Sequence, residues 1–301
     1  MRGLAEYIMR GRKQATFVVA IAAAIPLLFW LSAAALALVI LRRGLNEALP
    51  VLVWGVLPAL AWALMGDITP LMVILGCAGC AVLLREKGDW PRVLLASVPL
   101  GVVFALVLLT VMGEPLQALA AQIQERLPQL LADMEMGDGI NEANMARLES
   151  LLVPVLAGLM GTVHALMVLI SLMLGRSMQA KLYNPGGFQQ EFHRLRLSPL
   201  VAGGLLLLTL FGPQFGQLAM VSPISSLPLL IAGLALIHGV VGIKQLGSVW
   251  LVILYVVFVL GAQFVYPLIM LLAFIDSLFD VRTRLAPAKG PGDGNDSNSQ
   301  D

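Results

Sequence analysis

The stretch Leu151–Leu174, LLVPVLAGLMGTVHALMVLISLML, contains no Asp, Glu, Lys or Arg, and it decides the fold of the chain. A run of about 20 apolar residues can cross the hydrocarbon core of a bilayer as a single helix. Of the 301 residues, 59% are hydrophobic and 12% are charged, which leaves too little polar surface to cover a soluble protein of this size. The sequence therefore predicts an all-α, multi-pass membrane protein whose main partner is the lipid bilayer.

Similar apolar runs lie on both sides of this stretch, so that about eight membrane segments are predicted. They are Ala15–Leu41, Ala48–Met65, Ile68–Leu84, Val93–Met112, Leu151–Leu174, Pro199–Val221, Leu227–Ile243 and Val249–Ile275. The first and last runs are longer than one crossing needs. Each contains a helix breaker near its middle, Pro26 in the first and Gly261 with Pro267 in the last. We therefore predict that these two runs are interrupted.

Lys and Arg residues gather between the runs and predict the orientation. The clusters are Arg10–Lys13, Arg42–Arg43, Arg85–Arg92, Arg176–Arg196, Lys244 and Arg282–Arg284. Cytoplasmic loops of membrane proteins carry an excess of basic residues. If every cluster is cytoplasmic, the first and last runs must return to the side they left, as hairpins of short helices. The alternative is eight simple crossings with both termini outside, which leaves the terminal clusters on the wrong face. We favour cytoplasmic termini in a bacterial inner membrane.

The segment 113–149, directly before Leu151–Leu174, is acidic and is expected to lie outside the cytoplasm. Its apolar residues recur at helical spacing: Leu116, Leu119, Ile123, Leu127, Leu130 and Met134. A turn at 137–139 and a capping residue, Asn141, would lead into a second helix. We predict an extracytoplasmic helical insertion, which either rests on the bundle as a flap or gates a ligand cavity. Residues 1–285 then form the membrane domain, and the polar residues 286–301 form a disordered tail.

The segment 176–198, directly after Leu151–Leu174, is predicted to form a cytoplasmic loop with a turn and a short helix. The turn comprises Asn184, Pro185, Gly186 and Gly187, because proline fixes φ and glycine accepts positive φ. Phe188, Phe192 and Leu195 then recur at i, i+4 and i+7, which places them on one face of a helix. Arg194 and Arg196 belong to its polar side. We interpret this as an amphipathic helix at the membrane surface; the alternative is a solvated basic loop.

Two histidines, His164 and His238, fall inside predicted membrane segments. An ionisable group within a bilayer is costly unless it faces the protein interior, so each is a candidate ligand-binding or proton-handling residue. Small residues accompany both, with Gly161 beside His164 and Gly239 beside His238, and such residues let another helix approach closely. The alternative is that each histidine is neutral and hydrogen-bonded to a neighbouring helix for packing.

Other motifs point away from catalysis. Cys77 and Cys80 have CxxC spacing, but they lie in an apolar run without further Cys or His nearby, so we interpret them as packing residues. The chain contains no glycine-rich phosphate loop, nucleophile elbow or HExxH motif. The sequence predicts no enzyme, cofactor, metal site or nucleic-acid partner.

The turn at 184–188, followed by Glu191-Phe192 and 195–197 between two crossings, resembles the signature loop of the YybS-like family of bacterial multi-pass membrane proteins. The sequence of 276–282, DSLFDVR, is similar to the end of that family. The resemblance implies a fold distantly akin to the S components of energy-coupling-factor vitamin transporters, with a small-molecule cavity among the helices. The acidic insertion departs from the compact layout of S components.

Two functional hypotheses follow. In the first, the chain is a binding or transport module whose cavity is lined by His164 and His238 and capped by 113–149. In the second, it is an interaction or envelope-organising protein without a ligand, in which the basic residues and the phenylalanine face of 188–196 engage anionic head groups or a cytoplasmic or membrane protein partner.

Overall fold

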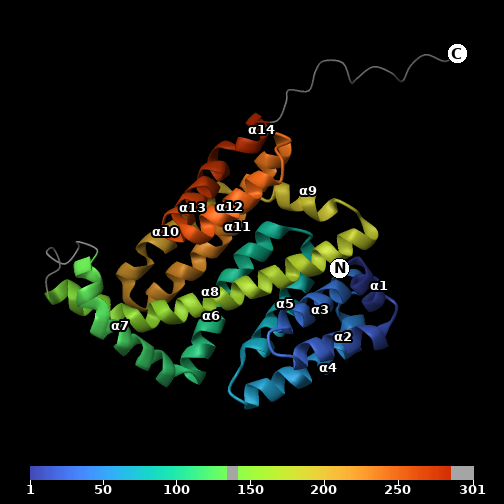
Figure 1. Cartoon of the computed structure of the whole chain (residues 1–301), viewed down its shortest axis with the longest axis horizontal. Helices are drawn as coiled ribbons and strands as arrows, with labels where there is room; N and C mark the ends of the chain where they lie inside the picture. The colour runs from blue at the N-terminus through green and yellow to red at the C-terminus, as the bar shows by residue number, and fades with distance from the viewer. Residues whose placement is uncertain (134–141, 286–301) are drawn as a thin grey trace.

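The computed structural model describes residues 1–133 and 142–285, and within these ranges the regular structure is entirely helical, which confirms the predicted fold class (Figure 1). The elements are α1 (Arg2–Met9), α2 (Arg12–Ala24), α3 (Phe29–Arg43), α4 (Leu45–Leu64), α5 (Thr69–Lys87), α6 (Trp90–Val111), α7 (Gly113–Asp133), α8 (Glu142–Tyr183), α9 (Gly187–Arg194), α10 (Pro199–Phe211), η2 (Gly212–Met220), α11 (Val221–Ile243), α12 (Val249–Leu260), α13 (Ala262–Phe279) and α14 (Val281–Leu285). The predicted turn at 137–139, the cap at Asn141 and the tail 286–301 lie outside the described residues.

Six helical stretches of the described chain are long and apolar enough to cross a membrane, compared with the eight segments expected. They are Leu45–Leu64, Thr69–Lys87, Trp90–Val111, Glu142–Tyr183, Pro199–Ile243 and Ala262–Phe279. The difference has a local cause at each place. The first apolar run is divided between two shorter helices, the last loses the short helix α12, and the sixth and seventh runs form one continuous stretch through η2. The protein is thus a multi-pass membrane protein.

The first apolar run breaks at Pro26. The preceding residue, Ile25, is extended, as expected before a proline, and Leu27 takes a φ of 64°. The chain then turns back, so that α3 packs along α2 (Figure 1). The Ser32 hydroxyl donates a hydrogen bond to the Val19 carbonyl at 2.8 Å, which ties the two helices together.

The last apolar run bends at Gly261, which ends α12 and precedes α13. In α12, Tyr255 contacts His238 near the end of α11, and in α13 Tyr266 contacts Ser226 near the start of α11. Past the bend, α13 leads back towards Arg282, which packs against Gly239 of α11. The two helices therefore run along α11 in opposite directions.

Most of the basic clusters lie at one end of the bundle, where hydrogen bonds link them to neighbouring helices. Arg43 donates to the Met9 carbonyl at 2.8 Å, and Arg85 donates to the Leu41 carbonyl at 2.6 Å. Gln179 of α8 also donates to the Leu41 carbonyl, at 3.2 Å. Figure 1 shows α1, α9 and α14 along this side of the molecule and α7 on the opposite side. We call the side that carries α1, α9 and α14 the basic end.

Helix α8 is too long to lie wholly within a bilayer. Its 42 residues measure about 63 Å at 1.5 Å per residue, against a hydrocarbon core of about 30 Å. The part that extends away from the basic end packs against α7, where Leu116 and Ala120 are buried (Figure 1). The insertion is thus helical over its described residues.

Small residues allow the central helices to approach one another closely. Helix α3 is buried from Ser32 to Leu41, and α8 crosses it where a Cβ at Gly175 would lie 2.7 Å from the Ala34 carbonyl oxygen. At the crossing of α8 and α6, a Cβ at Gly161 would press against the Gly101 carbonyl oxygen. Without a hydrophobic force between helices in lipid, such close packing is the main source of association.

Candidate functional site

His164 is held inside the bundle by two hydrogen bonds. Its Nδ1 lies 2.7 Å from the Met160 carbonyl and its Nε2 lies 3.2 Å from the Thr69 hydroxyl, and its ring packs on Phe104. The side chain is 6% exposed and lines none of the described pockets. Both ring nitrogens are therefore occupied by protein partners, an arrangement that fits the packing alternative.

His238 lies at the basic end, far from His164. Thr69 begins α5, whereas the other end of that helix carries the basic residues, so His164 is at the opposite end of the bundle. His238 instead packs against Phe192 of α9, with its Nε2 3.3 Å from the Tyr255 hydroxyl. None of the described pockets is lined by both histidines. The cavity shared by both histidines therefore stays a prediction, and among the described residues each histidine has its own surroundings.

The two glycines paired with these histidines also differ in their surroundings. Gly161 packs against α6, so its role is helix contact. Gly239 faces the basic end, where an added Cβ would lie 2.8 Å from the His193 carbonyl oxygen and 3.2 Å from the Arg282 Nε. Gly239 therefore lets α9 and α14 reach the surface of α11.

The turn before α9 is closed by a hydrogen bond from the Gly187 amide to the Asn184 carbonyl at 2.9 Å, and Gly186 takes a φ of 83°. Pro185 lies within this turn. The helix that follows carries Phe188 and Phe192 on one face, with their ring centroids 6.1 Å apart. Both phenylalanines pack on the hydrophobic core, so this face of α9 lies against the bundle.

Glu191 fastens α9 to the bundle. It accepts a hydrogen bond from the Trp90 indole at 3.1 Å and pairs with the Arg176 guanidinium, whose Nε lies 3.0 Å away. Arg176 also donates to Gln179 at 2.7 Å, and Gln179 in turn reaches α3. The polar side of α9 is thus bonded to α6 and α8.

Arg196 is engaged at the end of α13. Its Nε and Nη2 donate to the carbonyls of Asp276 and Ser277, each at 2.9 Å, and its Nη1 lies 3.1 Å from the Asp280 carboxylate. The Asp276 carbonyl also accepts the Asp280 amide at 3.0 Å, and both carbonyls lie in the last turn of α13, where a cation is favourable. Arg194, by contrast, is exposed.

A pocket of about 820 Å³ opens at the basic end between α9, α11, α12 and α14. It is lined by Gln189, Gln190, His193, Arg194, His238, Gly239, Val241, Gly242, Ile243, Gln245, Leu246, Ser248, Leu251 and Arg282. We call it the basic pocket. Its lining, as far as the structure describes it, contains two arginines, two histidines and three glutamines but neither Asp nor Glu. Its volume falls within the range of small-molecule sites.

Arg282 is the buried charge of this pocket. It is 8% exposed, and its Nη1 lies 3.4 Å from the Asp276 carboxylate, which is 2% exposed. Its Nε and Nη2 are buried without a hydrogen-bond partner in the described protein. Burial lowers the pKa of Arg282, and the nearby Asp276 opposes that shift. A buried guanidinium with two unsatisfied nitrogens is costly, because those nitrogens have lost their hydrogen bonds to water without gaining others. Most buried polar groups in proteins are hydrogen-bonded for this reason.

His193 shares this electrostatic environment. Burial lowers its pKa, and the neighbouring His238 and Arg282 lower it further. These effects favour the uncharged imidazole, which can both donate and accept a hydrogen bond.

An apolar chamber of about 400 Å³ adjoins the basic pocket. It is lined by Met173, Leu174, Ser177, Phe188, Gln189, Phe192, His193, His238 and Leu251. Gln189, His193, His238 and Leu251 line both spaces. The two spaces therefore meet around His193 and His238, with a polar half beside α14 and an apolar half beside α8.

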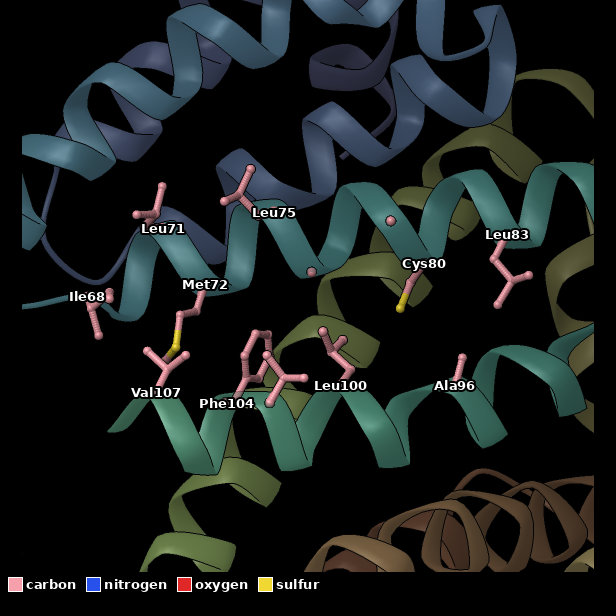
Figure 2. Close-up of a pocket in the computed structure, with 13 residues that line it drawn as sticks. Ile68, Leu71, Met72, Leu75, Cys80, Leu83, Ala96, Leu100, Phe104 and Val107 are labelled. Atoms are coloured by element: carbon pink, nitrogen blue, oxygen red, sulfur yellow. The ribbon is translucent and has the colours of Figure 1, made fainter. Parts of the chain in front are cut away.

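A separate groove lies between α5 and α6 (Figure 2). Its volume is about 510 Å³, and Met72 and Cys80 of α5 point towards α6, from which Leu100 and Phe104 point back. Both cysteines are free and buried, and Cys77 donates to the Ala33 carbonyl at 3.5 Å. The groove offers no charged group or amide that would orient a ligand, in contrast to the basic pocket.

Of the residues that line the basic pocket, the sequence singled out His238 and Gly239 as ligand-binding candidates and Arg194 as part of the cytoplasmic loop. It did not propose Gln189, Gln190, His193, Gln245 and Arg282 as site residues. The sequence marked Arg282 as part of a basic cluster and of the motif at 276–282, which places two acids and an arginine together after an apolar run. Among the described residues, no group of three or more His, Cys, Asp or Glu side chains could hold a metal ion. Comparison of the chain with protein-family models, curated proteins and solved structures gives no match.

Proposed function

We propose that this protein is a bacterial inner-membrane binding or transport module that takes a small molecule into the basic pocket from the cytoplasmic side. The single observation that carries the proposal is the buried, incompletely bonded Arg282 at the wall of a pocket large enough for a small molecule. The resemblance to the YybS-like family, and through it to S components, is compatible with a ligand-binding role but names no ligand.

The proposed orientation places the basic end in the cytoplasm. The positive-inside rule supports this choice, since the clusters at Arg43, Arg85, Arg176, Arg196 and Arg282 all lie at that end. In this arrangement α2 with α3, and α12 with α13, form hairpins within the bilayer, both termini are cytoplasmic, and α7 with the first part of α8 lies outside.

Cysteine labelling tests the orientation. In a background with Cys77→Ala and Cys80→Ala, Gln190→Cys in α9 should react with a membrane-impermeant maleimide in inverted vesicles but not in intact spheroplasts. Ser150→Cys in α8 should show the opposite pattern. Both positions are exposed, so the membrane alone controls access. Labelling of Gln190→Cys from outside the cell would contradict the proposed topology.

A pocket-filling variant tests the binding function. Ser248 is exposed and lines the basic pocket, so Ser248→Phe should occupy ligand space without disturbing the core. We expect mass spectrometry to detect a small molecule that co-purifies with the original protein. In Ser248→Phe its occupancy should fall about tenfold, which corresponds to a loss of about 1.4 kcal/mol of binding free energy. Ser150→Phe, on the opposite side of the molecule, is the matched control. Equal occupancy in both variants would place the ligand elsewhere.

The second candidate function is binding of a protein partner through the basic face of α9. One observation favours it: Arg194 is exposed at this end and has no hydrogen bond or ion pair in the described structure. The apolar face of α9 does not contribute, because Phe188 and Phe192 pack inwards. Arg194 is therefore the residue on which this candidate depends.

A further inference from the structure

The polar half of the site favours a negatively charged ligand. Its described lining combines Arg194 and Arg282 with uncharged donors from glutamine side chains, and it contains no acidic residue that would repel an anion. Asp276 pairs with one nitrogen of Arg282 but does not line the pocket. Arginine presents several N–H donors in a fixed fork that suits phosphate and carboxylate oxygens.

The unsatisfied nitrogens of Arg282 strengthen this inference. The chain bends sharply after α13, because Asp280 takes a left-handed φ of 47°, and this bend turns Arg282 back against α11. Asp276 holds the helix end by accepting the Val281 amide at 3.0 Å and keeps Arg282 charged beside the pocket. The protein thus holds Arg282 as a buried cation with two nitrogens, Nε and Nη2, that have no hydrogen-bond partner among the described residues.

The apolar half of the site points to a ligand with a hydrocarbon part. The chamber beside α8 is walled by Met173, Leu174, Phe188 and Phe192, and it meets the basic pocket around His193. A small hydrophilic anion would fill only the polar half. An amphiphile would place its charged group against the arginines and its apolar part against the phenylalanines, so that both halves are matched.

We propose that the ligand of this site is an anionic amphiphile with a phosphate-type head group and at least one acyl or prenyl chain. This inference rests on the binding function proposed above and specifies its ligand class. The head group lies against Arg282 and Arg194, and the chain enters the apolar chamber. Such a ligand reaches the site from the inner leaflet, beside which α9 lies in the proposed orientation.

Binding measurements with the purified full-length protein test the proposal. The probes are dioleoyl phosphatidic acid, dioleoyl phosphatidylcholine and inorganic phosphate, and the readouts are native mass spectrometry and the dissociation constant in detergent. We expect phosphatidic acid to bind about tenfold or more tightly than either other probe, since each charge-assisted hydrogen bond contributes strongly in a buried site.

Two variants locate the binding. Arg282→Gln alone leaves Asp276 unpaired and threatens folding, so it is combined with Asp276→Asn, which removes both charges and keeps the net charge. This double variant and Arg194→Gln should each weaken phosphatidic acid binding about tenfold. Arg284→Gln is the matched control for charge, because Arg284 is exposed on the same helix and does not line the pocket.

The alternative outcomes separate the claims. If phosphatidic acid and inorganic phosphate bind equally, the ligand is an anion without a tail and the amphiphile is rejected. If phosphatidylcholine binds equally well and the arginine variants have no effect, the anionic class is rejected. A neutral co-purifying molecule that Ser248→Phe excludes would uphold the binding function while overturning this inference.

Discussion

Replacing Gly161 with leucine is expected to destabilise the protein more than any other single substitution considered, by about 3 kcal/mol or more, because it forces two packed helices apart. A Cβ at this position would press on the Gly101 carbonyl oxygen and lie 3.0 Å from the Ala105 Cβ. Backbone atoms of α6 cannot move aside as a flexible side chain would. Thermal unfolding in detergent, followed by circular dichroism, measures the effect.

The matched control is Gly204→Leu in α10. Nothing lies within 4 Å of a Cβ there, and the residue is exposed, so the leucine would enter open space. We expect this variant to melt within a few degrees of the original protein. If Gly161→Leu is equally harmless, the closeness of α6 and α8 in the structure is wrong. If both variants are unstable, leucine in any glycine position disturbs insertion rather than packing.

The sequence predicted the glycine's proximity to a helix interface but not which helix it faces. A small residue in a membrane helix lets another helix approach closely, and this is the case at Gly161. The residue that Gly161 contacts, Gly101, is 60 positions away, and no feature of the sequence shows that the two glycines pack together. The same limit explains His164, whose hydrogen-bond partner Thr69 is 95 residues distant. Periodicity reports the face of a helix, whereas pairing depends on the whole arrangement.

The sequence was more informative about helix interruptions that a single residue type causes. Pro26 predicted the interruption of the first apolar run, because proline disfavours helical geometry at the preceding residue, and Ile25 is extended. The candidate pocket could not be predicted in this way. It depends on Asp280, whose left-handed conformation turns Arg282 towards α11, and aspartate adopts that conformation only in particular contexts.

Reversing the charge of Arg196 is expected to cost about 3 kcal/mol of stability, whereas the same change at Arg194 should cost less than about 0.5 kcal/mol. Arg196→Glu loses two hydrogen bonds, to the Asp276 and Ser277 carbonyls, and it places a second carboxylate beside Asp280. Arg194 makes no such bonds in the described structure and is exposed. Thermal unfolding of the two variants measures the difference.

The conservative variant Arg196→Lys identifies the cause of the loss. Lysine keeps the charge but cannot reproduce the fork that serves two carbonyls and a carboxylate together, so an intermediate loss is expected. If Arg196→Lys is as stable as the original protein, the charge alone is sufficient and the carbonyl contacts contribute little. Equal stability of Arg196→Glu would show that the contacts of Arg196 with the end of α13 contribute little to stability.

This difference decides how the partner-binding function can be tested. A functional defect in Arg196→Glu would follow from unfolding at the end of α13, whether or not a partner exists, so it carries no information about binding. Arg194→Glu leaves the fold intact and changes both the basic pocket and the exposed face of α9. The two roles of Arg194 then separate by readout: loss of ligand with normal pull-down of partners supports the pocket, and retained ligand with loss of a partner supports the interaction surface.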